Sequence, residues 1–390
     1  ATNHDAAWVF FKAHSAGGTN WQHVRLVADK VLNPTGCGQQ AGTKLEFIVP
    51  DGPDGFTGIF LQRAEPGAGP VSAKGVTVVC EVQSLNPEPR TLSTALQAFG
   101  IEMVYVPEGP FHLGSGGTEA NRFYQYTDGS QDTLPYPVTD AGPIPTGPQE
   151  GRLWATGVQP DGSDAGEIPT AFPNGFRAFY CMKYQLKQGQ FAGFLGMQSE
   201  VRSYYHAYRP GNGMSLAKVG TAFLQGVTWE QGTAFGSWAG LRPMTELEFE
   251  KAWRGPRKPV PDEIGPGYWG IRELASDGLV QRLVSVGRPE GLQFAGTHGN
   301  GSTSLPTDWP QGRSPGIAQR GDDWEVRPSY GEGVTGTRPS LRRRMYAEGD
   351  TDSWRGVRTA PNPMAVAKPG MGDGGFKLEL GPLTAMGDLD

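Results

Sequence analysis

Cysteine, histidine and charged residues are scarce in this chain of 390 residues, and each scarcity argues against a class of function. The 3 cysteines show no C-x-x-C spacing and the 6 histidines do not cluster with them, so no structural zinc site is indicated. Charged residues make up 19% and the net charge is −6, which leaves no basic field for nucleic acid. No apolar run approaches the roughly 20 residues of a membrane-spanning helix. We therefore expect neither a nucleic-acid partner nor a membrane span.

Glycine and proline, by contrast, are abundant: 58 and 33 residues, together nearly a quarter of the chain. With 37% hydrophobic residues, this composition favours many turns and loops over long helices. Aromatic residues reach 10%, enough to bury large areas, so a folded chain is expected rather than a disordered one. The length allows two or three domains with cores of their own.

The first hundred residues carry short strand-like segments separated by turn residues. AAWVFFKA (6–13) and WQHVRLVA (21–28) flank the turn-rich SAGGTN and predict a hairpin. KLEFIVP, GIFLQR and VTVVCEV follow between Gly, Pro and Asp turns, as in a β-sandwich of about one hundred residues. We expect residues 1–98 to form an all-β sandwich with an adhesive or spacer role.

The start of the chain and its cysteines bear on location. The chain begins at Ala1 rather than Met, as a mature chain does after removal of a signal peptide, although other starting points would give the same sequence. An extracellular or cell-surface location is therefore expected. In that setting Cys37 and Cys80, which share the first domain, could form a disulfide, leaving Cys181 as a core thiol.

The segment RPMTELEFEKAWRG (242–255) predicts a short helix with both ends marked. Thr245 and Glu248 have the spacing of a capping box, in which each side chain bonds the other's backbone N–H. Gly255, followed by Pro256, predicts the end of the helix. One apolar stripe is formed by Phe249, Ala252 and Trp253. A second helix is expected over 187–196, with a half-apolar face formed by Gln190, Phe191, Phe194 and Leu195.

Four other segments accompany this helix: IEMVYVPEGPFHLGS (101–115), FRAFYCMKYQLKQGQFAGFLG (176–196), YWGIRELASDGLVQRLVSVG (268–287) and SWRGVRTAP (353–361). Together the five resemble, in the same order, segments of the formylglycine-generating enzyme (sulfatase-modifying factor) family, such as R-L-P-T-E-A-E-W-E-x-A-A-R-G and the closing G-F-R-x-A. The resemblance implies a loop-rich α+β domain with a C-type-lectin-like fold over residues 99–362. The whole chain is then expected to be α+β: the all-β sandwich, this domain and a Gly/Pro-rich extended tail over 363–390.

The family includes copper-dependent oxidases, iron-dependent sulfoxide synthases and non-catalytic binding proteins, so individual residues must decide the function. The resemblance places the oxidases' copper-binding cysteine pair shortly before the closing motif, where this chain has no cysteine. The synthases use three histidines for iron. Within the family-like region this chain has widely separated histidines only, at His112, His206 and His298.

Calcium is a further possibility that the resemblance raises. Where the family has G-N-V-W-E-W, this chain has SDGLVQR, and Asp277 keeps one oxygen ligand. Since calcium takes six to eight oxygens, a single acid is a weak candidate. We expect no cofactor, with calcium left open at Asp277.

A cluster of arginine and aromatic residues lies late in the family-like region, in the part that faces ligands in lectin-type folds. Its members are Trp324, Arg327, Tyr330, Arg338, Arg342, Arg343, Arg344, Tyr346 and Trp354. Such side chains offer planar contacts and several donors, which favours recognition. The alternative is that Arg344 or its neighbours brace the core, as an arginine here does in the family.

The tail carries one alternating segment, FKLEL (376–380), with the pattern of an added edge strand. It could dock on its own chain or on a neighbouring copy, and the second case would give an oligomer or polymer. We expect a secreted, non-catalytic structural or binding protein that acts in adhesion or assembly, with itself or another extracellular protein as partner. The alternatives are a metal-dependent oxidase or sulfoxide-synthase-like enzyme of the same fold and a lectin-fold ligand receptor.

Overall fold

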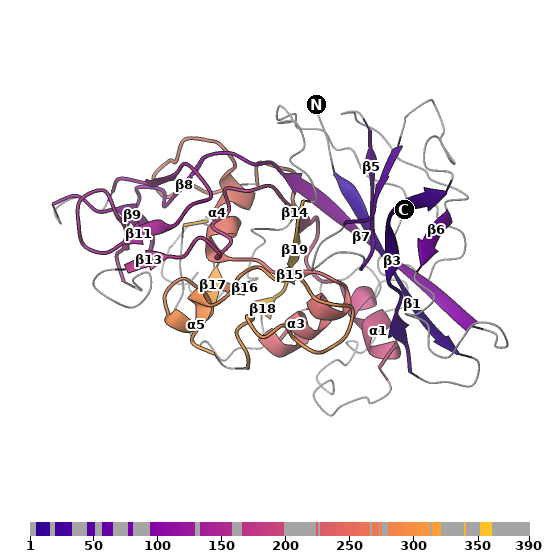
Figure 1. The fold of residues 1–390 in the computed structure, drawn as a ribbon. Helices are drawn as coiled ribbons and strands as arrows, with labels where there is room; N and C mark the ends of the chain where they lie inside the picture. The colour runs from indigo at the N-terminus through magenta and orange to yellow at the C-terminus, as the bar shows by residue number, and fades with distance from the viewer. Residues whose placement is uncertain are drawn as a thin grey trace, which may run out of the picture.

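The computed structural model describes a mainly β protein with a few short helices (Figure 1). It describes residues 5–15, 20–32, 45–50, 57–64, 77–80, 94–128, 133–157, 166–198, 224, 227–265, 267–272, 274, 280–312, 314–320, 339–340 and 352–360. Most strand pairs are antiparallel, and the strands form several separate sheets. The expected mixture of strands and short helices is therefore present.

The largest sheet has eight strands and contains segments from both ends of the described chain. Strand β2 (Gln22–His23) pairs with β1 off the main path, so the expected first hairpin is confirmed. The remaining order is β15 (Arg242–Pro243), β19 (Gly356–Thr359), β14 (Phe179–Met182), β7 (Thr94–Val106), β1 (Ala6–Ser15), β5 (Ile59–Arg63) and β4 (Leu45–Ile48).

Strand β7 crosses the boundary that we expected between residues 98 and 99. It pairs with β1 over ten residue pairs, from Ala6↔Met103 to Ser15↔Thr94, and with β14 beyond them. The physical reason is the alternation of Phe99, Ile101 and Met103, all buried on one face, which continues through Gly100 without a turn. The structure therefore does not divide the chain at this point, since β1 and β14 belong to one sheet.

Each face of this sheet is covered by a different layer. On one face, residues of β1 and β7 share a core with helices α1 (Gln188–Gly196) and α3 (Trp229–Trp238). Helix α1 lies where the sequence predicted it, with Gln190, Phe191 and Phe194 buried. The other face packs against β3 (Leu26–Leu32) and β6 (Thr77–Cys80), which form a two-stranded sheet.

Strand β1 also supplies side chains that cap the C-terminal end of α3. Trp8 Nε1 donates to Ala239 O at 2.8 Å, and Lys12 Nζ donates to Trp238 O at 2.7 Å. The last carbonyls of a helix have no partners within it and carry its negative dipole end, so a buried ammonium is well placed here. Lys12 Nζ also donates to Gly301 O at 2.6 Å and lies 3.0 Å from His23 Nδ1. The first strand is thus tied to a helix more than two hundred residues later.

The remaining elements form a second part of the molecule, at the left of Figure 1. Helix α4 (Glu246–Arg254) lies at its centre, beside β8. Its strands form three small sheets. One pairs β8 (Phe111–Leu113) with β10 (Tyr136–Val138), and a four-stranded sheet has the order β13 (Gly166–Ile168), β11 (Ile144–Thr146), β12 (Leu153–Ala155) and β9 (Phe123–Gln125). A three-stranded sheet has the order β17 (Ile317–Arg320), β16 (Val280–Val284) and β18 (Asp352–Ser353). Helix α5 spans Pro289–Leu292. No helix in the described ranges combines the length and apolarity needed to cross a membrane.

Candidate functional site

Helix α4 begins and ends at the residues that its sequence predicts. Glu248 N donates to Thr245 Oγ1 and Thr245 N donates to Glu248 Oε2, both at 3.1 Å, so the capping box is formed. Gly255 follows with φ 62°, a conformation that a residue with a Cβ adopts rarely. The prediction of this helix is confirmed.

The environment of α4 differs from the expected amphipathic pattern, because all nine residues of the helix are buried. The apolar stripe packs into a core cluster of its own with Val104, Phe179 and Val357. A second stripe, Glu246, Glu250 and Arg254, would face solvent on an ordinary surface helix. Here each of these three residues is 0% exposed.

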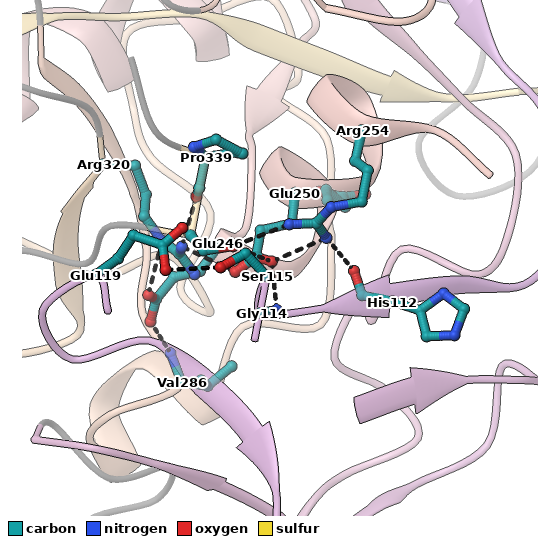
Figure 2. Close-up of polar contacts among 12 residues, drawn as sticks. His112, Gly114, Ser115, Glu119, Glu246, Glu250, Arg254, Val286, Arg320 and Pro339 are labelled. Atoms are coloured by element: carbon teal, nitrogen blue, oxygen red, sulfur yellow. Dashed lines mark hydrogen bonds and ion pairs between the residues drawn. The ribbon is translucent and has the colours of Figure 1, made fainter. Parts of the chain in front are cut away.

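A buried ion-pair network explains how these charges are accommodated (Figure 2). Arg320, at the end of β17, donates through Nε to Glu246 Oε2 at 3.2 Å and through Nη1 to Glu250 Oε1 at 2.9 Å. Arg254 Nη1 lies 3.3 Å from Glu250 Oε2. The side chains of these four residues are fully buried, and their two positive and two negative charges cancel. Such pairing is the condition under which burial of ions is tolerated.

A serine hydroxyl and two backbone N–H groups donate further hydrogen bonds to the two carboxylates. Glu246 Oε1 accepts from Ser285 Oγ at 2.9 Å and from Val286 N at 3.0 Å. Glu250 Oε2 accepts from Gly114 N at 2.7 Å, directly after β8. Helix α4 is therefore joined by charge-assisted bonds to β8, to the end of β16 and to β17.

Arg254 extends the network towards the surface. Its guanidinium donates to Glu263 Oε1, to the carbonyl oxygen of His112 and, at 2.9 Å, to Ser340 Oγ. Burial raises the pKa of the Glu263 carboxyl, an effect that Arg254 opposes. We define the charge network as Glu246, Glu250, Arg254, Glu263 and Arg320.

A neighbouring carboxyl lacks such compensation. Glu119 is 1% exposed and accepts from Ser115 Oγ at 2.6 Å (Figure 2). Burial raises its pKa, more than the Ser115 hydrogen bond lowers it. The other two charged residues of α4 are also engaged: Glu248 pairs with Arg242 at 2.6 Å, and Lys251 Nζ donates to Gly175 O at 2.6 Å and Phe176 O at 2.8 Å.

The charge network fixes both ends of segment 321–338. Arg320 precedes this segment, and its Nη1 donates to the carbonyl oxygen of Pro339, which follows it, at 3.0 Å. Ser340 is fully buried against Arg254 and Glu250. Segment 341–351 then starts from Ser340 and leads into β18. Both segments therefore start or end on the buried charge network, which serves as their base.

These two segments carry nearly all of the recognition cluster proposed from sequence. The exception is Trp354, which is 1% exposed and packs edge-on against Phe235 and over Gly232 and Gly236 of α3. Trp354 is therefore a core residue, not part of a ligand-facing surface. The other members, Trp324, Arg327, Tyr330, Arg338, Arg342, Arg343, Arg344 and Tyr346, lie outside the described residues.

The remaining predicted sites are placed as follows. Asp277 and Cys37 lie outside the described residues, as does the tail 363–390, and Cys80 is described only by its backbone in β6. Cys181 is a free, buried thiol, and burial raises its pKa to about 12, as suits the expected core residue. In the ranges that the structure describes, no three His, Cys, Asp or Glu side chains gather as metal ligands would.

Sequence reasoning missed both the charge network and helix α3. The T-x-x-Q spacing of Thr228 and Gln231 could have revealed α3, because it forms a capping box like that of α4. No comparable signal exists for the network, since Arg320 lies about seventy residues from α4. A charged stripe at intervals of four residues usually marks the solvent-facing side of a helix, so this pattern predicts exposure for residues that are buried.

Comparison with known proteins gives no assignment: no protein-family model matches this chain, and no curated protein matches it.

Proposed function

We propose that the protein is a non-catalytic binding protein that acts outside the cell in adhesion or assembly, and that segments 321–338 and 341–351 form its contact surface. The observation that carries this proposal is the hydrogen bond from Arg320 to Pro339 O, which closes segment 321–338 on the buried base. Binding residues are commonly placed on loops that a rigid scaffold positions.

The composition of these segments supports a recognition role. They contain five arginines together with two tyrosines and a tryptophan, residue types enriched where binding energy concentrates. Acidic residues are about as numerous in the same segments, so no strongly charged partner such as nucleic acid is favoured. A protein surface with mixed polar and apolar character fits best.

The family resemblance favours a scaffold role for α4 over a catalytic one. The motif that carries the resemblance supplies Glu246, Glu248, Glu250 and Arg254, and each of these side chains holds an internal partner. The copper-binding cysteine pair of the family's oxidases is missing from this sequence before the closing motif. We propose that the chain keeps a lectin-like framework and uses its loops for binding.

Replacing segment 321–338 by a Gly/Ser linker of equal length tests the proposal. Since Arg320 and Pro339 are kept, the melting temperature should stay close to that of the unaltered protein. Binding of the purified protein to the surface of the cells that produce it should be lost. A control linker replacing residues 158–165 should leave binding intact. Equal binding by both variants would overturn the proposal.

Metal analysis of the same purified protein tests the non-catalytic part. We expect copper and iron well below one ion per chain. Stoichiometric copper or iron that survives dialysis would favour the metal-dependent enzyme instead. Calcium added during the binding assay should change neither binding nor melting temperature.

A further inference from the structure

A buried lysine and a histidine face each other across the first two strands. Lys12 of β1 is 1% exposed and lies opposite His23 of β2, with 3.0 Å between Lys12 Nζ and His23 Nδ1. Strand β2 pairs with β1 through two residue pairs, the second being Ala13↔Gln22. The position of so short a strand depends strongly on its side-chain contacts, because few ladder hydrogen bonds hold it.

The hydrogen bonds of His23 fix which ring nitrogen carries its proton. His23 Nε2 lies 2.7 Å from the carbonyl oxygen of Thr57, which accepts and cannot donate. Nε2 therefore carries the proton, and the lone pair of Nδ1 faces the ammonium of Lys12. Lys12 Nζ is thus the donor in the contact between the two side chains.

The pair has as many N–H donors as acceptors when it holds one positive charge. The three N–H groups of the ammonium face Trp238 O at 2.7 Å, Gly301 O at 2.6 Å and His23 Nδ1 at 3.0 Å. The N–H of the imidazole faces Thr57 O. Transfer of the proton from Lys12 to Nδ1 keeps the same number of bonds, because the neutral amine then accepts from the imidazolium. The geometry therefore fits one charge, whichever nitrogen carries it.

A second proton is not accommodated by this geometry. It would place an N–H of Nδ1 against the ammonium, so that two like charges replace one hydrogen bond. The other charges that act on the imidazole are the guanidinium groups of Arg358 and Arg25, both positive. The three carbonyl oxygens around the pair already accept one N–H each. His23 itself is half-buried, so solvent can deliver the proton.

The surrounding backbone limits how the pair can respond to repulsion. Gly301 has φ 87° and packs so closely on the imidazole that a Cβ at this position would overlap Cγ and Nδ1 of His23. Lys12 cannot withdraw, because β1 pairs with β7 over ten residue pairs and with β5 over four. The repulsion therefore acts on β2, the shorter and less extensively paired strand.

We propose that Lys12 and His23 form a pH-sensitive switch, in which uptake of a second proton releases β2 from β1 and from Gly301 while the large sheet stays folded. Burial, and then Lys12, lower the pKa of His23 well below its ordinary value. The switch is therefore closed at neutral pH and opens as the pH falls through that lowered value. It uses neither segment 321–338 nor segment 341–351, so it does not rest on the function proposed above.

Hydrogen exchange at Val24 tests this inference, because Val24 N–H donates to Phe11 O at 3.0 Å across the two strands. On lowering the pH from about 7.5 to about 4.5, we expect the protection of this amide, corrected for the intrinsic exchange rate, to fall at least about tenfold. The β7–β14 ladder should keep its protection. In His23→Gln the amide oxygen still accepts from Lys12 but takes up no proton, so the change at Val24 should disappear. His14→Gln, on the same hairpin, is the matched control and should behave as the unaltered protein does.

A permanent second charge gives the converse test. His23→Lys places an ammonium beside Lys12, so Val24 should already be unprotected at about pH 7.5 while the β7–β14 ladder remains protected. If this variant does not fold, the comparison between the unaltered protein and His23→Gln decides alone. The proposal is wrong if Val24 keeps its protection at low pH, or if His23→Gln responds as the unaltered protein does. Loss of protection in the β7–β14 ladder together with Val24 would indicate global unfolding and would also overturn it.

Discussion

Two regions of this molecule bury positive charge in different ways. Around α4, the guanidinium groups of Arg254 and Arg320 face carboxylates, and the charges cancel. At the end of α3, the ammonium of Lys12 faces two backbone carbonyls and the ring of His23, with Trp238 4.5 Å away. In the first region, opposite charges stabilise the buried cations. In the second region, neutral carbonyl oxygens and the negative end of the helix dipole stabilise the buried ammonium.

The difference predicts what each region loses when its cation is removed. In the charge network, a lost guanidinium leaves an ionised carboxylate buried, which is costly. At the α3 end, a lost ammonium leaves neutral carbonyls, which cost less. Burial lowers the pKa of Lys12 well below its ordinary value, so keeping the charge there already carries a cost.

Removal of Arg320 should have the largest effect. Arg320→Met leaves Glu246 and Glu250 without one of their partners in a fully buried site, and we expect a loss of about 3–5 kcal/mol in the free energy of unfolding. Urea denaturation measures this loss. Lys258→Ala, at an exposed position after α4, is the control and should change stability by less than about 0.5 kcal/mol. A loss below about 1 kcal/mol for Arg320→Met would show that the network is not a buried one.

Lys12→Met should have a smaller effect, because the groups that it leaves are neutral. The variant keeps most of the side-chain volume but leaves Trp238 O and Gly301 O without this donor, and we expect a loss of about 1–3 kcal/mol. The same urea measurement applies. Lys12→Arg serves as the control for charge: its larger head group should not restore stability in a closed site. If Lys12→Met costs as much as Arg320→Met, the distinction between charged and neutral partners fails.

The pH response should separate the two regions further. The pKa of His23 is lowered well below its ordinary value by burial, by Lys12 and, more weakly, by Arg358 and Arg25. In the unfolded chain His23 takes up a proton near pH 6.5, whereas in the folded protein it does so only at lower pH. The contribution of His23 to stability is therefore fully present above pH 6.5 and falls as the pH decreases, by at most about 1.4 kcal/mol per pH unit.

Urea denaturation between about pH 7.5 and 5.5 measures this slope on both sides of the unfolded-state pKa. In His23→Gln, whose amide oxygen can still accept from Lys12, the slope should decrease. A slope with the same sign should remain, because burial lowers the pKa of Lys251 to about 7 and, together with Arg254, lowers that of His112. Equal slopes in the variant and the unaltered protein would show that His23 does not control this range.

The sequence predicts local features of both regions but not their partners. The Thr245–Glu248 capping box, the stop at Gly255 and the first hairpin depend on residues that are near in sequence, and the structure contains them. The burial of Glu250 depends on Arg320, and the burial of Lys12 on carbonyls of α3 and residue 301, all set by tertiary contacts.

The expected domain boundary has the same explanation. We expected the boundary between residues 98 and 99, yet both residues and Gly100 pair with β1 inside one continuous ladder. This pairing joins strands about ninety residues apart, so a local reading of the sequence does not reveal it. The composition of segments 321–338 and 341–351 is enough to predict the contact surface that we propose. It does not predict the charge network at the ends of these segments, because the side chains of that network are distant in sequence.

Helix caps provide the smallest and most local comparison. Helices α3 and α4 both start with a threonine whose Oγ1 accepts from the third helical N–H, at 3.2 Å from Gln231 and 3.1 Å from Glu248. Thr228 is exposed, whereas Thr245 is buried and also donates to Pro173 O at 2.9 Å. Water can replace the lost acceptor at the first position but not at the second.

We therefore expect Thr245→Ala to cost about 1–2 kcal/mol and Thr228→Ala about 0.5–1 kcal/mol. Thr→Ser at each position keeps the oxygen and should recover most of the loss, which separates the cap from the lost methyl group. Urea denaturation of the four variants measures the difference. Equal losses for the two alanine variants would mean that the stabilisation by the cap does not depend on whether the threonine is buried. A larger loss at Thr245 would mean that burial of the cap residue itself also sets the strength of a single cap.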